Sequence, residues 1–234
     1  MLKIIDEIQK NLLNVIFPIC CNGCSNLLLK NEKVICVKCM HNLPFTNHHQ
    51  IKETEIHKVF YGLIPFEFGA SILYFNKKGI TQNLIHNLKY RNREEIGTYL
   101  GNLYSNDIRN LESIKNIDCI IPVPLHKKRL QERGYNQVTS FGSAIGKNLN
   151  IPVLEDVLKK TKNLKSVTDQ SKESRLEHNK NVFSIENYEN IEGKHILLID
   201  DVFTTGATIE ACAKEILRIK NTKISILTIA YSQS

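Results

Sequence analysis

The most specific local pattern in the chain is ILLIDDVFTTGATIEAC, residues Ile196 to Cys212. Four apolar residues are followed by the carboxylates Asp200 and Asp201, and then by a turn rich in threonine and glycine. After the turn, apolar positions recur at helical spacing. A buried strand that leads directly into a helix is half of a βαβ unit, and such units build parallel sheets. The stretch therefore predicts an α/β fold.

The turn between strand and helix has the chemistry of a phosphate site. A helix N-terminus presents unpaired N–H groups and a partial positive charge, so it attracts anions. Glycine lets the backbone curl closely around the anion, and threonine hydroxyls add donors. The two carboxylates can accept hydrogen bonds from sugar hydroxyls or take part in Mg²⁺ binding. We expect a phosphorylated sugar at Asp200, Asp201, Thr204, Thr205, Gly206, Ala207 and Thr208.

Further apolar runs extend the predicted sheet. Asp118–Val123 and Ile224–Ala230 are continuous apolar segments, as expected for buried parallel strands, and alternation predicts a strand around Ala70–Phe75. Helical spacing predicts three helices, over Ile80–Arg91, Tyr135–Leu149 and Thr208–Ile219.

Two other segments are interpreted as irregular. Leu43 to about Gly62 reads as a polar connection. Lys159–Asn181 is polar and charged without a clear period, so it predicts a mobile loop.

Competing phosphate-binding motifs fail on details. Gly146 and Lys147 are followed by Asn148, so the Walker A pattern is absent, and no G-x-G-x-x-G occurs. An acidic pair after a strand also opens phospho-receiver domains, but only 33 residues follow Asp201, too few to complete one. A solvent-exposed loop with accidental acids is the remaining structural alternative.

The Ile196–Cys212 string resembles the signature of type I phosphoribosyltransferases, which has apolar residues, two acids and a Thr-Thr-Gly-x-Thr loop. In that family the acids hold the ribose hydroxyls of phosphoribosyl pyrophosphate (PRPP), and the loop holds its 5′-phosphate. The resemblance implies the ribose role for Asp200 and Asp201 and the phosphate role for Thr204–Thr208, with Mg²⁺ bound together with PRPP.

Four cysteines form two tight pairs separated by eleven residues. Two such pairs can supply four thiolates to a tetrahedral Zn²⁺ ion. The rival interpretation is a redox CxxC motif, which usually stands alone beside a βαβ unit. The spacing predicts a structural zinc site at Cys21, Cys24, Cys36 and Cys39.

Two neighbours are alternative zinc ligands, because Cys20 adjoins the first pair and His41 follows the second. Cys119 and Cys212 are expected to be inert core residues. With seven cysteines and no secretory signal, a disulfide framework is disfavoured and a reducing, cytoplasmic setting is expected. No run reaches the ~18 apolar residues of a membrane span.

Length and charge limit the possible organisation of the chain. Its 234 residues suit a small N-terminal unit, residues 1–45, and a larger domain, residues 46–234. The first unit would contain an amphipathic helix over Met1–Ile16 and the four-cysteine finger. The net charge of +7 favours anionic partners without choosing among them.

Basic residues gather in three segments, Lys77–Arg93, Pro122–Gln137 and Thr168–Phe183. The second begins where a predicted buried strand ends, so it should project into the same cleft as the phosphate loop. Cations there suit pyrophosphate, although a solvated charged turn is the plain alternative. The predicted pyrophosphate ligands are Lys127, Lys128 and Arg129.

Taken in order, the segments resemble the ComF family of phosphoribosyltransferase-like competence proteins. The shared pattern is a cysteine finger, LxxLKYxG, PVPLHxxRxxxRGxNQ, a flexible-loop motif and VDDVxTTGAT, spanning Cys20–Ala230. Asn92 stands where the family often has glycine, and the loop spacing runs from Gln170 to Arg175. The resemblance implies a role in natural transformation, where imported single-stranded DNA is handled.

Three functions follow as hypotheses. The first is a glycosyltransferase reaction, Mg²⁺-assisted transfer of phosphoribose from PRPP to an unidentified nucleophile, with the Thr168–Asn181 loop excluding water. No catalytic base is identifiable. The second is a non-catalytic accessory protein that binds PRPP or single-stranded DNA, with Tyr90 and Tyr135 stacking on bases. The third is a zinc-scaffolded interaction protein with a vestigial loop.

Overall fold

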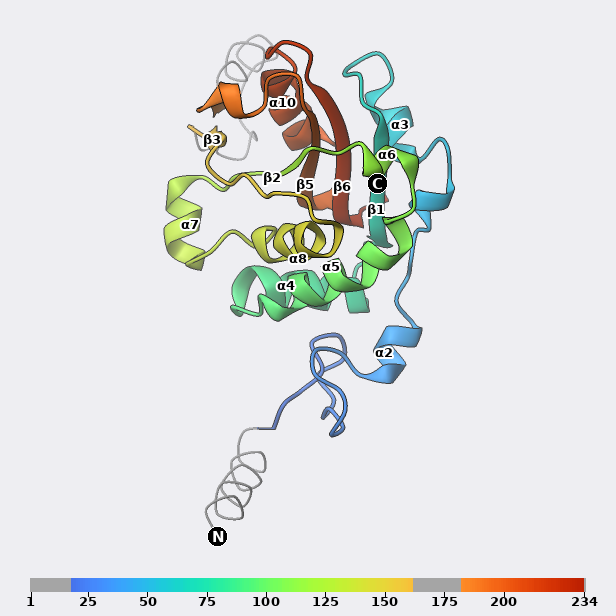
Figure 1. Cartoon of the computed structure of the whole chain (residues 1–234). Coiled ribbons are helices and arrows are strands. Elements are labelled where there is room, and N and C mark those ends of the chain that lie inside the picture. The colour runs from blue at the N-terminus through green and yellow to red at the C-terminus, as the bar shows by residue number, and fades with distance from the viewer. Residues whose placement is uncertain (1–17, 162–181, 234) are drawn as a thin grey trace, which may run out of the picture.

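The computed structural model describes residues 18–161 and 182–233. A four-stranded parallel sheet in the order β1-β6-β5-β2 forms its centre (Figure 1). The strands are β1 (Phe68–Tyr74), β2 (Cys119–Pro122), β5 (His195–Phe203) and β6 (Lys223–Tyr231). The parallel sheet predicted from the apolar runs is therefore confirmed.

Helices cover both faces of this sheet. Because successive side chains of a strand point to opposite faces, Leu197 and Ile199 of β5 pack with one helical layer, while Ile196 and Leu198 pack with the other. The first layer contains α4 (Ile80–Tyr90), α5 (Glu95–Ile108) and α8 (Thr139–Leu149). The second contains α3 (Glu55–Phe60) and α10 (Ala207–Ile216). The result is a three-layer α/β/α arrangement.

Short elements complete the described chain. An antiparallel hairpin of β3 (Leu158–Lys160) and β4 (Phe183–Ile185) packs beside α10. The remaining elements are α2 (Val37–His41), η1 (His48–Gln50), α6 (Glu112–Lys115), α7 (Lys127–Arg133) and η2 (Tyr188–Asn190). Within the described ranges, no helix has the length and hydropathy that crossing a membrane requires.

The cysteine finger protrudes below α4 in Figure 1 and packs against the first helical layer. The side chain of Asn83 on α4 donates to the carbonyl of Gly23 at 2.7 Å, and that of Asn87 donates to the carbonyl of Asn22 at 3.0 Å. A Cβ at Gly23 would lie 2.9 Å from a methyl group of Ile80. Glycine therefore permits this close approach, and the boundary at residue 45 stays a prediction.

Four sequence-based assignments need correction. The presumed polar connection Leu43–Gly62 contains η1 and α3, because Ile56 and Phe60 are buried against the sheet. The helix predicted over Tyr135–Leu149 begins at Thr139, and the one predicted over Thr208–Ile219 spans Ala207–Ile216. The presumed loop Lys159–Asn181 begins inside β3.

A fifth correction concerns the acids. Asp200 and Asp201 lie within β5 rather than after it, because β6 continues alongside and pairs as far as Phe203 with Tyr231. The predicted helix Met1–Ile16 and the loop residues Gln170 and Arg175 lie outside the described residues.

Candidate active site

The predicted phosphate loop connects the end of β5 to α10. Gly206 is the N-cap of α10 and adopts the left-handed conformation at φ +78°. Its carbonyl accepts the first helical hydrogen bond, from the Glu210 N–H at 2.8 Å. Gly206 is buried, whereas the loop positions that flank it are exposed, namely Thr204, Thr205, Ala207 and Thr208. The loop thus presents hydroxyls and helix-terminal N–H groups to solvent, which suits an anion.

The conformation of this loop depends on the absence of a side chain at Gly206. A Cβ there would lie 2.8 Å from the ring of Phe60 and 3.0 Å from the ring of Phe203, both of which are buried. The two rings meet edge to face with centroids 5.4 Å apart. These two rings, which form an aromatic floor beneath the loop, therefore fix the position at which the backbone enters α10.

Asp201 is held from two sides. The Lys89 ammonium group on α4 lies 2.8 Å from Oδ1 of Asp201, and the Gln137 amide donates to Oδ2 at 2.5 Å. The Asp201 side chain is only 8% exposed. Buried carboxylates need such partners to remain ionised. Sequence reasoning missed both Lys89 and Gln137 as site residues, although both lie in the quoted motifs LxxLKYxG and PVPLHxxRxxxRGxNQ.

Asp200 lies in a different electrostatic environment. Its carboxylate Oδ1 accepts a hydrogen bond from the Asp201 backbone N–H at 2.8 Å. Burial and the neighbouring negative charge of Asp201 nevertheless raise the pKa of Asp200 to about 7. The two adjacent acids therefore differ in environment, since the ion pair with Lys89 is made by Asp201.

The segment that follows β2 starts at the same edge of the sheet as the acid pair. The Val123 N–H donates to the carbonyl of Ile199 at 2.8 Å, directly before Asp200. The segment folds back, because the Asn136 side chain donates to the Val123 carbonyl at 3.0 Å. This return brings Gln137 to Asp201. The two phosphate-binding segments predicted from the sequence thus meet at the carboxyl ends of β2 and β5, where parallel sheets bind ligands.

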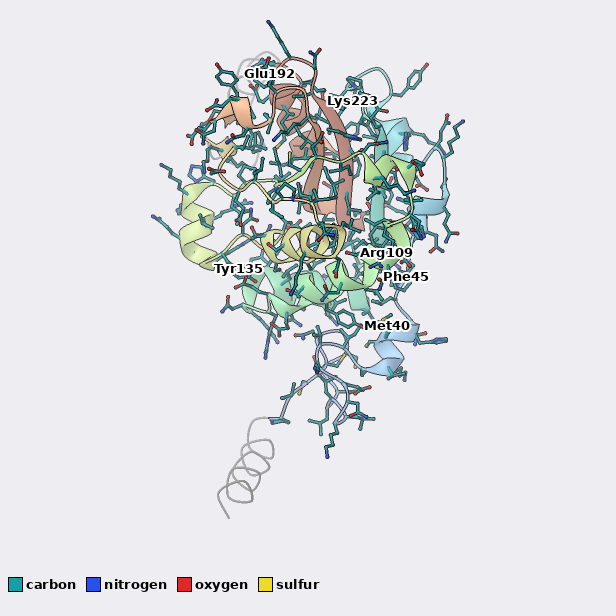
Figure 2. All side chains as sticks on the ribbon, in the orientation of Figure 1. Met40, Phe45, Arg109, Tyr135, Glu192 and Lys223 are labelled. Atoms are coloured by element: carbon teal, nitrogen blue, oxygen red, sulfur yellow. The ribbon has the colours of Figure 1, made fainter. Side chains whose placement is uncertain are left out.

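The predicted pyrophosphate ligands are exposed on α7 but do not share one cavity. Arg129 lines a cavity of about 520 Å³, whose cations are Lys89, Arg91, Arg129 and Arg133. Tyr135, labelled in Figure 2, and Tyr90 line it too. Lys127 instead lines a second cavity of about 820 Å³, and Lys128 lines neither. The assignment of all three to pyrophosphate therefore stays a prediction.

The second cavity lies between α7 and the β3–β4 hairpin. Its lining includes Lys127, Lys159, Lys160 and three glutamates. Burial lowers the pKa of the Lys160 amine, and the positive charge of Arg129 lowers it too, while Cys212 and Asp200 oppose this shift. The charges of Lys160 and Asp200 thus affect each other's pKa, and the hairpin adds a further cation to the lining of the second cavity.

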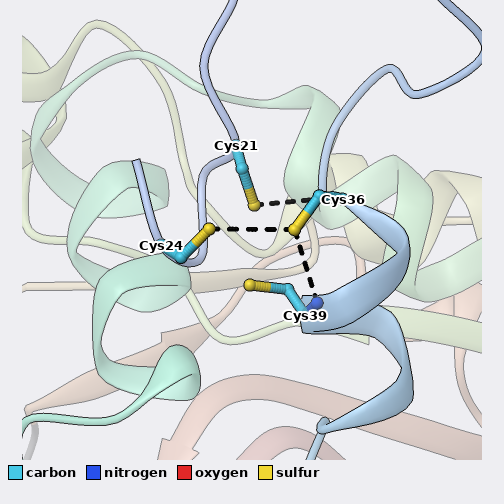
Figure 3. A group of neighbouring side chains, drawn as sticks. All are labelled: Cys21, Cys24, Cys36 and Cys39. Atoms are coloured by element: carbon cyan, nitrogen blue, oxygen red, sulfur yellow. Dashed lines mark hydrogen bonds between the residues drawn. The ribbon is translucent and has the colours of Figure 1, made fainter. Parts of the chain in front are cut away.

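The four predicted metal ligands form one cluster. The sulfur atoms of Cys21, Cys24, Cys36 and Cys39 all lie within 4.8 Å of one another and point toward a common centre (Figure 3). The Sγ atoms of Cys24 and Cys36 are 3.7 Å apart. A tetrahedron with Zn–S bonds of about 2.3 Å has sulfur atoms about 3.8 Å apart. The cluster is therefore compatible with zinc.

Backbone donors support thiolates in this cluster. The N–H groups of Gly23 and Cys36 donate to the Cys21 sulfur at 3.3 Å and 3.2 Å, and the Cys39 N–H donates to the Cys36 sulfur at 3.4 Å. Burial raises the pKa of the Cys21 thiol, but backbone hydrogen bonds outweigh it and lower that pKa to about 7. These contacts stabilise the charged form of Cys21, whereas burial and the neighbouring sulfur atoms raise the pKa of the Cys39 thiol.

The other cysteines and His41 fall outside the cluster. Cys20 is exposed, the cluster includes Cys21 rather than Cys20, and His41 is not among the grouped side chains. Cys119 and Cys212 are fully buried, as predicted. Burial raises the pKa of the Cys119 thiol to about 11, which keeps it protonated and inert.

Together, the parallel sheet, the acid pair and the glycine-capped loop define a domain of the phosphoribosyltransferase type. Residues 139–234 match the family model described as phosphoribosyl transferase domain. The chain is 30% identical to competence protein F of Haemophilus influenzae over 151 residues, which covers 63% of this chain and 66% of that protein, just under two thirds.

Two further relatives are matched over longer spans. DNA utilization protein YhgH of Escherichia coli O157:H7 is 27% identical over 201 residues, covering 85% of this chain and 84% of that protein. Competence protein ComFC of Bacillus subtilis is 26% identical over 216 residues, covering 91% of this chain and 84% of that protein. The chain belongs to the ComF family of type I phosphoribosyltransferase-like proteins.

Proposed function

We propose that the protein binds PRPP together with Mg²⁺ and transfers its phosphoribosyl group to an acceptor. The observation that carries this proposal is the loop at Gly206, whose left-handed N-cap directs the open N–H groups of α10 outward beside the acid pair. In this arrangement the 5′-phosphate would lie on residues Thr205–Thr208. The ribose hydroxyls would donate hydrogen bonds to Asp200 and Asp201.

The chemistry of the reaction follows from these positions. The acceptor's electron pair forms a bond to C1 of the ribose while the C1–O bond to pyrophosphate breaks, and the pyrophosphate leaves with that electron pair. Bound Mg²⁺ would neutralise part of the pyrophosphate charge. Arg129, which lines the 520 Å³ cavity, would stabilise the negative charge on the leaving group. The acceptor would lose its proton to solvent.

Calorimetry with PRPP and Mg²⁺ tests the binding step. The variant Asp201→Asn keeps the size of the side chain but removes its charge. Losing a charge-assisted hydrogen bond costs ~1.5–3 kcal/mol, so affinity should fall roughly ten- to more than a hundredfold. Asp107→Asn is the matched control, because Asp107 is exposed on α5. Absence of binding by the wild-type protein would refute the proposal. Release of pyrophosphate in a screen of nucleobases, amines and nucleic acids tests the transfer step.

A second candidate function is an accessory role in DNA uptake through binding of single-stranded DNA. The names of the relatives, competence protein and DNA utilization protein, favour it. So does the 520 Å³ cavity, in which Arg133 lies over the ring of Tyr90 at 5.2 Å and Tyr90 remains 66% exposed. Exposed aromatic rings among cations suit bases and phosphates. DNA binding unaffected by Asp201→Asn would favour this function over transfer.

We also propose that the cysteine cluster holds a structural zinc ion. The grouping of four sulfur atoms within 4.8 Å of one another, together with their backbone donors, supports this. Small zinc units fold together with their metal, so the ion would stabilise the finger and its contact with α4. All seven cysteines are free, which fits a reducing compartment, and we therefore place the protein in the cytoplasm.

A further inference from the structure

Lys89 is the link between the acid pair and the cation-lined cavity. It lies in the last turn of α4, and its side chain is 21% exposed. The ammonium group forms the 2.8 Å ion pair with Asp201 and also lines the 520 Å³ cavity beside Arg91, Arg129 and Arg133. A lysine side chain that is mostly covered loses part of its hydration, which an ion pair must offset. Its position is therefore tied to the charge of Asp201.

Neighbouring groups hold this end of α4 in place. The Tyr135 hydroxyl donates to the carbonyl of Leu88, the residue before Lys89. On the other side, the Arg133 guanidinium lies over the Tyr90 ring and donates to the Gln137 side chain at 2.7 Å. The same Gln137 donates to Asp201. Lys89 and Gln137 thus contact the two oxygens of the Asp201 carboxylate from separate segments. Arg133 connects these segments through its contacts with Tyr90 and Gln137.

The carboxylate retains capacity for a ligand in this arrangement. Its two oxygens offer about four lone-pair positions, and Lys89 and Gln137 each occupy one. The two positions left are acceptors only, which suits the hydroxyl donors of a ribose ring. Without the ammonium charge, Asp201 would lie beside Asp200 with no counter-charge in direct contact, and a shared proton would remove an acceptor position.

We propose that Lys89 is a positioning residue of the ribose subsite and acts through Asp201. Its ammonium group fixes the orientation of the Asp201 carboxylate and offsets the repulsion between the adjacent acids. This inference rests on the proposed function, since it assigns the residue that prepares the PRPP-binding acids. It separates Lys89 from Arg91, Arg129 and Arg133, which line the same cavity but form no ion pair with Asp201 within the described residues.

Two ligands distinguish this role from a direct contact with pyrophosphate. Ribose 5-phosphate has the ring hydroxyls and the phosphate of PRPP but lacks pyrophosphate. Calorimetry would measure both ligands against the wild-type protein and against Lys89→Met, Lys89→Gln and Lys89→Arg. Arg91→Met is the matched control, because it removes a cation from the same cavity and leaves the ion pair to Asp201 in place. Circular dichroism would confirm that each variant is folded.

The expected result is that Lys89→Met and Lys89→Gln weaken both ligands by a similar factor of about ten or more, as for loss of a charge-assisted contact. Lys89→Arg should restore most of the affinity, and Arg91→Met should leave ribose 5-phosphate binding unchanged. Unchanged or tighter ribose 5-phosphate binding by folded Lys89→Met or Lys89→Gln would overturn this inference and leave the proposed function standing. A wild-type protein that binds neither ligand would overturn the proposed function, and this inference with it.

Discussion

Replacing Gly206 by alanine should lower the free energy of unfolding through two separate effects, one in the backbone and one steric. The first is the left-handed backbone at φ +78°, which costs a residue with a Cβ ~1–2 kcal/mol. The second is steric, because the new Cβ would lie 2.8 Å and 2.9 Å from two ring atoms of Phe60, which is 1% exposed. Overpacking of this kind costs ~1–3 kcal/mol. We expect the free energy of unfolding to fall by ~2–5 kcal/mol in total.

Gly193→Ala is the control that separates these two costs. Gly193 has a similar φ of +71°, but a Cβ there would meet nothing within 4 Å. It should therefore show only the backbone cost of ~1–2 kcal/mol. Urea denaturation followed by circular dichroism gives both free energies of unfolding. If the two variants are destabilised equally, the aromatic floor does not set the position of the loop and the reasoning from Phe60 is wrong.

Three further predictions concern metal, pH and nucleic acid. Cys24→Ser should release zinc and loosen the finger, whereas Cys20→Ser should retain the metal, and elemental analysis of purified protein would refute the zinc site if wild type contains none. Because the pKa of Asp200 is raised in the folded protein to about 7, its contribution to stability is present below about pH 4 and declines as pH rises through 7. Asp200→Asn should therefore be less pH-sensitive in denaturation between pH 4 and 8, and parallel profiles would contradict the raised pKa. Binding of single strands, if it occurs at the 520 Å³ cavity, should weaken steeply with salt, and a flat response in fluorescence anisotropy would exclude a phosphate contact there.

The sequence predicted the sheet well because its strands are buried on both faces. Runs such as Asp118–Val123 and Ile224–Ala230 carry their pattern locally, and the observed strands follow them closely. The acids were harder to place. Asp200 and Asp201 interrupt the apolar pattern, so β5 seemed to end at Ile199, yet β6 supplies backbone partners alongside them and prolongs the strand to Phe203. A strand's length depends on its neighbour as well as on its own residues.

The helix α5 shows a different limit. Ile96, Leu100, Tyr104 and Ile108 recur at helical spacing and are buried, so local periodicity was sufficient to find this helix, although no helix was predicted there. The short helix α3 is different, since its six residues offer little period. Ile56 and Phe60 become interpretable only when the sheet that buries them is known. Short elements are therefore decided by tertiary packing.

The composition of the site was the least predictable part, because its partners come from three distant segments. The loop at Gly206 was found because it is continuous in sequence, and its Thr-Gly chemistry is local. The partners of Asp201 are Lys89, at the end of α4, and Gln137, before α8. They meet Asp201 toward the carboxyl end of β5, the edge at which parallel sheets bind ligands. From the sequence of its own segment, Lys89 could equally have been a solvated surface charge. Its 2.8 Å contact with a buried carboxylate distinguishes it from Lys127 and Lys128, which are exposed on α7. The ion pair, and not the local density of positive charge, therefore identifies the cation on which ligand binding at this site should depend most.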